Sequence, residues 1–110
     1  SQGQNQTPGT IGKPVAVLNN TGGTTYKIRL NAASFSPANV VASEYYNVTN
    51  NTEAPSGSQI STSLTFGADM DTGKTIEGNN GIRHLWLKLT FGSQANQSAT
   101  SQFSVVGEMP

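Results

Sequence analysis

The chain has 110 residues, no net charge, no cysteine and only 11% charged residues, against roughly 25% in a typical soluble protein. This length predicts one small domain, and its core is modest because hydrophobic residues make up 34%. The Lys and Arg residues form no basic patch of the kind expected in a nucleic-acid-binding protein. No apolar run approaches the ~18 residues of a membrane span, and without cysteine there is no disulfide or thiolate metal site.

The N-terminal part of the chain is expected to be an extended arm followed by an edge strand. Residues 1–12 are polar apart from Ile11, so they carry no core-forming pattern. The folded domain is expected to span residues 13–110. Its first strand is predicted at 13–19, at an edge or at a strand start, because Pro14 cannot donate a hydrogen bond to a ladder.

A turn at residues 20–23 and a second strand at 24–31 follow. The turn contains two glycines, which adopt positive φ without steric cost. The strand alternates Lys27 and Arg29, expected to face outward, with three apolar residues expected to face a core, namely Tyr26, Ile28 and Leu30. The first strand, the turn and the second strand together predict a β-hairpin.

The strongest strand signal in the chain is Arg83–Phe91. One face is apolar and consists of Leu85, Leu87, Leu89 and Phe91. The other face consists of His84, Trp86, Lys88 and Thr90. Because this alternation is the longest in the sequence, we expect this strand to lie centrally, with the other strands paired with it or packed over it.

Three further strands are predicted at residues 40–48, 58–66 and 100–107. For the first of these, two registers remain open. One places Val41, Ser43 and Tyr45 inward, and the other places Val40, Ala42 and Tyr46 inward. The second strand is expected to carry Ile60, Thr62, Leu64 and Phe66 on one face, and the third is expected to carry Phe103 and Val105 on one face and Val106 on the other.

Residues 67–81 predict a long turn region with Ile76 as an inward anchor. No segment carries the 3.6-residue period of an amphipathic helix. Six short strands without a helix predict an all-β fold, a small antiparallel β-sandwich of the jelly-roll or immunoglobulin-like type. Since immunoglobulin-type sandwiches usually have seven or more strands, we expect an exposed edge that a strand from a neighbouring subunit completes.

The pattern Asp69-x-Asp71-x-Gly73 resembles the opening of a calcium-binding loop. The twelfth position counted from Asp69 is Asn80, where an EF-hand needs a bidentate Glu. Two interpretations therefore stay open, a calcium site and a solvated turn. No other cofactor is indicated.

The single histidine, His84, has no Ser, Cys or acidic partner nearby in the sequence that would suggest nucleophilic catalysis. We expect it to face solvent or a neighbour. No acid–base pair stands out elsewhere, so the chain is not expected to be an enzyme.

Trp86 alternates out of phase with the leucines around it and is expected on the opposite face of the strand. A tryptophan on the outer face of a sheet usually packs under another group. Cover by a loop of the same domain and contact with another subunit both fit, and the sequence does not decide between them.

Several Asn-x-Ser/Thr acceptors for N-linked glycans suggest an extracellular or cell-surface location. They are Asn5, Asn19, Asn47, Asn50 and Asn96. Glycans are expected on Asn47, Asn50 and Asn96, which are predicted at strand ends where a bulky sugar is tolerated. The chain also begins at Ser1 without Met, as expected of a secreted protein after signal removal.

Two stretches resemble the secreted TasA/camelysin-like fibre proteins and the related archaeal bundling pili and surface threads. The first is VLNNTGGTTYKIRL at Val17–Leu30, and the second is IEGNNGIRHLWLKLTF at 76–91 followed by TSQFSVVGE at 100–108. The resemblance implies a jelly-roll-like sandwich that assembles into an extracellular filament. It also implies that each subunit is completed by a terminal strand of its neighbour.

The leading hypothesis is therefore a structural subunit of an extracellular filament, a homopolymer assembled by β-strand donation. Ile11, Val15 and Val17 share one face in an extended chain and are the expected anchors of the donated segment. The alternative is a non-catalytic carbohydrate-binding or adhesive sandwich module of a larger surface protein.

Overall fold

The computed structural model describes residues 5–6, 14–50, 53, 55–92 and 98–109. Within them the chain forms strands and one short 3₁₀ turn, and no helix is long and apolar enough to cross a membrane. The strands are β1 (Asn5–Gln6), β2 (Ala16–Asn20), β3 (Tyr26–Ala32), β4 (Val41–Thr49), β5 (Thr62–Ser63), β6 (Asp69–Ile76), β7 (Gly81–Phe91) and β8 (Phe103–Glu108). The 3₁₀ turn η1 is Gly57–Gln59.

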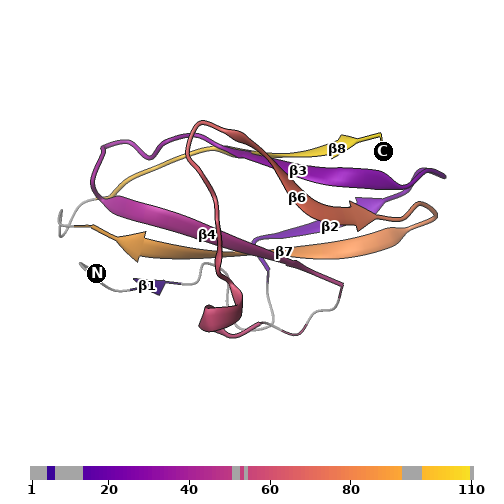
Figure 1. Ribbon diagram of the computed structural model, residues 1–110, viewed down its shortest axis with the longest axis horizontal. Helices are drawn as coiled ribbons and strands as arrows, with labels where there is room; N and C mark the ends of the chain where they lie inside the picture. The colour runs from indigo at the N-terminus through magenta and orange to yellow at the C-terminus, as the bar shows by residue number, and fades with distance from the viewer. Residues whose placement is uncertain (1–4, 7–13, 51–52, 54, 93–97, 110) are drawn as a thin grey trace.

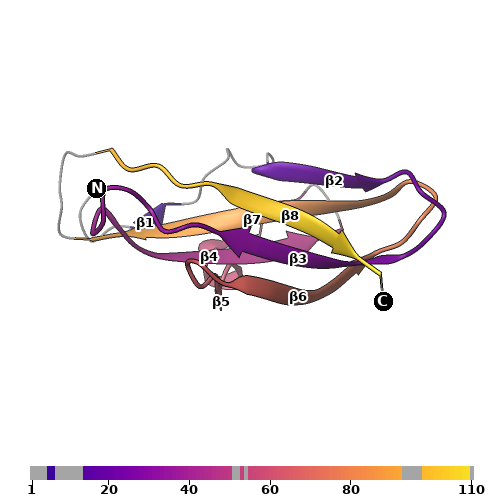
Figure 2. The same ribbon diagram turned by 90° about the horizontal axis from the view of Figure 1, so that it is seen from above.

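The strands form two antiparallel sheets that lie face to face, seen as upper and lower layers in Figure 1. In sheet A, β4 pairs with one edge of β7, and β1 and β2 both pair with the other edge; β5 extends the sheet beyond β4. In sheet B the order is β6–β3–β8 (Figure 2). The predicted all-β sandwich is confirmed.

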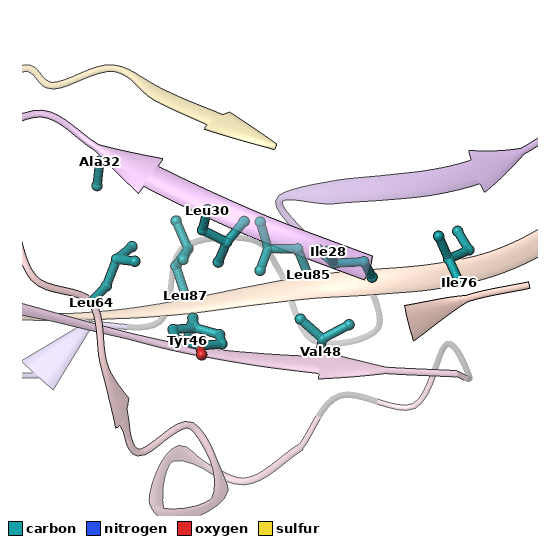
Figure 3. Close-up of a cluster of buried hydrophobic side chains, with 9 residues drawn as sticks. All are labelled: Ile28, Leu30, Ala32, Tyr46, Val48, Leu64, Ile76, Leu85 and Leu87. Carbon is teal, nitrogen blue, oxygen red and sulfur yellow. The ribbon is translucent and has the colours of Figure 1, made fainter. Parts of the chain in front are cut away.

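The core lies between the two sheets (Figure 3). Its buried members are Ile28, Leu30, Ala32, Tyr46, Val48, Leu64, Ile76, Leu85 and Leu87. The inward positions predicted for β3 are correct, with Tyr26 packed at the margin of this cluster. Burying one large apolar side chain stabilises the fold by roughly 1.5–3 kcal/mol, so this small cluster is the main source of stability.

β7 is the central strand of sheet A, as its alternation predicts. Leu85 and Leu87 point into the core, while Trp86 on the opposite face is also buried, at 1% exposed. His84 is 5% exposed, so of the two surroundings expected for it, solvent or a neighbour, the first is wrong. A strand whose two faces are both covered has little freedom to slip in register.

The predicted hairpin of the first two strands is wrong, because β2 belongs to sheet A and β3 to sheet B. Asn20 fixes the crossing between the sheets. Its Nδ2 donates to the carbonyls of Thr24 at 2.7 Å and Ile76 at 3.1 Å, and its Oδ1 accepts from the Gly22 amide. Gly78 lies so close that an added Cβ would come within 2.6 Å of the Gly23 backbone. The chain does turn after Asn20, but contacts with residues distant in the sequence accompany the pairing of β2 with β7 and not with β3.

Neither register proposed for 40–48 holds along the whole of β4, because a β-bulge interrupts it. Val41 pairs with Phe91 but Ser43 pairs with Thr90, which leaves Ala42 unpaired and exposed. The bulge switches the buried face, so Val41 is buried before it, and Tyr46 is buried after it.

The interpretations of 58–66 as a strand and of 67–81 as a turn are both wrong. The first segment contains η1 and the two-residue β5, although Ile60 and Leu64 are buried as expected. Within the second segment β6 pairs with β3, with a bulge at Thr72–Lys74 that Gly73 makes possible through φ of 72°. Ile76 is buried as predicted. The count of six strands was therefore wrong as well.

Glu44 lies on the inward face of β4 and is only 4% exposed. Burial raises the pKa of its carboxyl group above the ordinary value of 4.5. The stabilisation from the protonated Glu44 carboxyl is therefore fully present below the pKa of the unfolded chain, and it is lost as pH rises through the pKa of the folded protein. Glu44→Gln should resist urea better than wild type near neutral pH, and the difference should vanish at pH values below 4.5.

Glu77 provides a control, because its pKa is shifted in the direction opposite to that of Glu44. Its pKa is lowered mainly by a hydrogen bond from Arg83, whose Nη2 lies 2.6 Å from Glu77 Oε2. Its contribution is present above the unfolded pKa and is lost as pH falls, so Glu77→Gln should weaken the protein near neutral pH and not in acid. Urea curves that respond to pH in the same way for both variants would contradict the burial of Glu44.

Candidate functional site

The edge of β7 opposite β4 is the place where the predicted donor segment meets the domain. β2 pairs there from Ala16 with Leu85 to Asn20 with Gly81. β1 pairs farther along, with Asn5 opposite Thr90. In the described part of the chain, neither β1 nor β2 pairs with any other strand. The N-terminal segment is therefore an edge element, as Pro14 suggested for 13–19.

The three residues predicted to anchor the donated segment differ in their surroundings. Ile11 lies outside the described residues. The Val15 amide donates to the Leu85 carbonyl at 3.0 Å, and the Val15 side chain packs against the core. Val17 points away from the core and is 59% exposed. The expectation that Val15 and Val17 share a face is wrong, because β2 begins at Ala16 and strict alternation does not extend back to Val15. Within β2 itself, Ala16 and Leu18 are the side chains packed against the core.

Trp86 is covered by the protein itself. Its Nε1 donates to Thr49 Oγ1 at 2.8 Å, and its cross-strand partner Asn47 donates to the Gln59 carbonyl at 3.2 Å. The η1 segment therefore lies against this outer face of sheet A, as seen below the lower layer in Figure 1. Of the two covers that the sequence left open for Trp86, the structure shows the one by the same domain, and a contact with another subunit would require this segment to move.

The glycan acceptors differ in surroundings. Asn19 is exposed near the end of β2, and Asn50 is exposed directly after β4. Asn47 lies inside β4 with its Nδ2 hydrogen-bonded, so its expected position at a strand end is wrong. Asn5 lies in β1, and Asn96 is outside the described residues.

The two carboxylates of the calcium-like pattern lie on the outer face of sheet B, in ion pairs. Lys27 Nζ is 3.3 Å from Asp71 Oδ2, and Arg29 Nε is 3.7 Å from Asp69 Oδ2 and 3.4 Å from Glu108 Oε2. The pKa of Asp71 is lowered, first by a hydrogen bond from the Gly73 amide and then by Lys27. Among the described residues, no group of three or more His, Cys, Asp or Glu side chains could hold a metal.

Two open surfaces were not foreseen from the sequence. A cleft of ≈470 Å³ at one end is lined partly by Phe35 and Phe66, whose rings meet edge to face with centroids 5.6 Å apart. A smaller groove of ≈180 Å³ lies between β2 and β8. Each combines residues from three or more distant segments, so no local pattern could reveal it. The groove residues are Leu18, Asn19, Asn20, Tyr26, Ile28, Ile76, Val105, Val106 and Gly107.

The fold places the chain in the class of small two-sheet β-sandwiches with an N-terminal edge segment. Comparison with protein-family models, with curated proteins and with solved structures gave no match.

The surroundings of Trp86 can be followed directly, because it is the only tryptophan. We expect the emission of the soluble monomer to be blue-shifted relative to urea-unfolded protein, since the indole is 1% exposed. If copies assemble through the N-terminal segment, as the sequence leads us to expect, the emission should stay the same. A change in emission or in acrylamide quenching on assembly would instead indicate that Trp86 takes part in a subunit contact.

Glycan occupancy should follow exposure in the folded chain. Peptide mapping of native protein, with enzymatic deglycosylation in heavy-oxygen water, should show more glycan on Asn50 than on Asn47, because Asn47 Nδ2 is engaged with Gln59. An intact mass equal to that of the bare sequence, or occupancy of Asn47 alone, would contradict this expectation.

Proposed function

We propose that this chain is a non-catalytic structural subunit of an extracellular filament, in which each copy donates its N-terminal segment to the next. The observation that carries the proposal is that β1 and β2, the described strands of this segment, pair with one edge of β7 and with no other described strand. The same edge can accept the same segment from a second copy with identical contacts, which is the logic of strand exchange.

The connection after β2 favours such an exchange. Residues 21–25 are all exposed and contain Gly22 and Gly23. Because β2 and β3 lie in different sheets, β2 can leave the domain without breaking a strand pair of sheet B. It has to release the bond from Asn20 Nδ2 to the Ile76 carbonyl and the bond from the Asn79 amide to the Gly22 carbonyl. The loop therefore serves as a hinge, and β3 keeps its pairs with β6 and β8.

The donated segment contributes packing as well as backbone hydrogen bonds. Val15, Ala16 and Leu18 lie against the core. The larger side chains contribute roughly 1.5–3 kcal/mol each when fully buried, and less at partly buried positions such as these. An open copy exposes this surface until a neighbour covers it, which drives assembly. Ile11 extends the apolar segment toward the N-terminus.

A second candidate function is a carbohydrate-binding or adhesive module. It is supported by the ≈470 Å³ cleft beside Phe35 and Phe66, whose volume lies in the roughly 300–1,000 Å³ range of small-ligand sites. Asn39 and Ser34 supply polar groups at its rim. Such a module is expected to remain a monomer, so sedimentation velocity distinguishes the two functions.

Removing residues 1–12 should shorten or abolish filaments while leaving a folded β domain. The deletion removes β1 and Ile11 but keeps every strand of the core. Negative-stain microscopy gives filament length, and circular dichroism checks the fold. Filaments of normal length and stability from the truncated protein would defeat the proposal.

A peptide competition tests the same edge without altering the protein. A synthetic peptide of residues 1–20 in excess should occupy the β7 edge of open copies and shorten filaments. The matched control carries Val15→Asp and Leu18→Asp, which place unpaired charges against the core and should have no effect. Equal shortening by both peptides would show that the segment does not act through this edge.

A further inference from the structure

The last strand of sheet B, β8, has a free edge. β8 pairs with β3 on one side, and no described strand pairs with its other side. It is six residues long and contains no Lys, Pro or bulge of the kind that usually protects an edge strand from another chain. Phe103 and Val106 are 41% and 44% exposed. An edge with these properties is a template for pairing.

The hydrogen-bond pattern shows which residues face this edge. Ala33, directly after β3, donates to the Gln102 carbonyl at 2.8 Å, in the same register as the ladder of β3 with β8. Because backbone groups of an antiparallel strand alternate in direction, every second residue from Gln102 onward bonds to β3. The residues between them direct both N–H and C=O toward the free edge; they are Phe103, Val105 and Gly107.

The same three residues lie on the side of β8 that faces sheet A, because their β3 partners Ala32, Leu30 and Ile28 are buried. Val105 packs against the core, and Val105 and Gly107 line the ≈180 Å³ groove together with Leu18 and Tyr26. Figure 2 shows β8 as the outermost strand of sheet B on the side where β2 lies. The groove is smaller than the roughly 300 Å³ of the smallest usual ligand sites, so it suits a single side chain.

We propose that β8 is an interface between two copies of this chain, paired antiparallel about a two-fold axis at Val105. In this register Val105 lies opposite Val105 of the second copy, and Phe103 lies opposite its Gly107. Each Phe103 then fills the groove beside the glycine of the other copy, a pairing in which an aromatic ring covers the surface that glycine leaves open. This contact does not depend on filament assembly.

The position of Glu108 favours an antiparallel pair of β8 strands over a parallel pair. Glu108, the one ionisable side chain of β8, is held by Arg29 at 3.4 Å. An antiparallel pair keeps the two Glu108 residues at opposite ends of a strand ~20 Å long, whereas a parallel pair would place them side by side.

The contact at β8 is small. So short an edge buries less than the roughly 800 Å² per partner of a stable interface. Pairing is therefore expected at high protein concentration, or between copies already held together.

Cross-linking tests the register, because the chain has no cysteine of its own. Ser104→Cys and Val106→Cys change two exposed positions, paired on β3 with Asn31 and Arg29, that face each other across the proposed pair. Non-hydrogen-bonded partners have Cα atoms ~4.5 Å apart, within the ~4.4–6.8 Å range of disulfides. After mild oxidation of the concentrated full-length chains, the mixture should give heterodimers linked between positions 104 and 106, several-fold above the homodimers of either variant. Absence of heterodimers, or homodimers linked at 104, would overturn the proposal.

Blocking the groove tests the role of Phe103. A Cβ at Gly107 would meet Tyr26 atoms at 3.5–3.7 Å, an ordinary contact, so Gly107→Val should fold and fill the groove. Added to the cross-linking variants, Gly107→Val and Phe103→Ala should each lower the heterodimer yield several-fold. Thr75→Val, an exposed change on the distant edge strand β6, should leave it unchanged. An undiminished yield in folded Phe103→Ala protein would refute the Phe103–Gly107 contact, whatever the outcome for filaments.

Discussion

The structure depends on the burial of β7 on both of its faces. Leu85 and Leu87 anchor the core on one face, while Trp86 is held on the other by its bond to Thr49 and by the η1 segment. Every other strand of sheet A is bound to β7 directly or, for β5, through β4. Because a slip of one residue would exchange the leucines with Trp86 and His84, the register of the whole sheet is fixed by this strand.

Five of the twelve charged residues form ion pairs on the outer face of sheet B. Lys27 and Arg29 on β3 form ion pairs with carboxylates of β6 and β8, so side chains connect the three strands across their exposed face. Such exposed pairs contribute little to stability because water and salt screen them, and their main effect is to neutralise the face. A surface with so little free charge offers weak repulsion between copies, which is compatible with close assembly.

The two proposed contacts between copies use different sheets and different kinds of complementarity. Exchange of the N-terminal segment replaces existing pairs of β7 with equal pairs from a neighbour. Pairing at β8 adds hydrogen bonds where none exist within the described chain, and it is weaker because the edge is short. A strong contact that connects copies in a row, combined with a weak contact at the side, would give long filaments that associate laterally.

The sequence by itself determined the elements whose residues alternate regularly. Arg83–Phe91, the inward face of β3 and the burial of Ile76 follow from side chains that are apolar at every second position or isolated among polar ones. The tertiary structure decided the rest, because the deciding contacts join residues distant in the chain. Asn20 bonds to Ile76 at the point where the chain passes from β2 in one sheet to β3 in the other. Residues 69–76 form β6 because their backbone pairs with β3, about 40 residues earlier in the chain. The groove at β8 exists only because Leu18, Tyr26 and Gly107 come together there, and no local pattern contains that information.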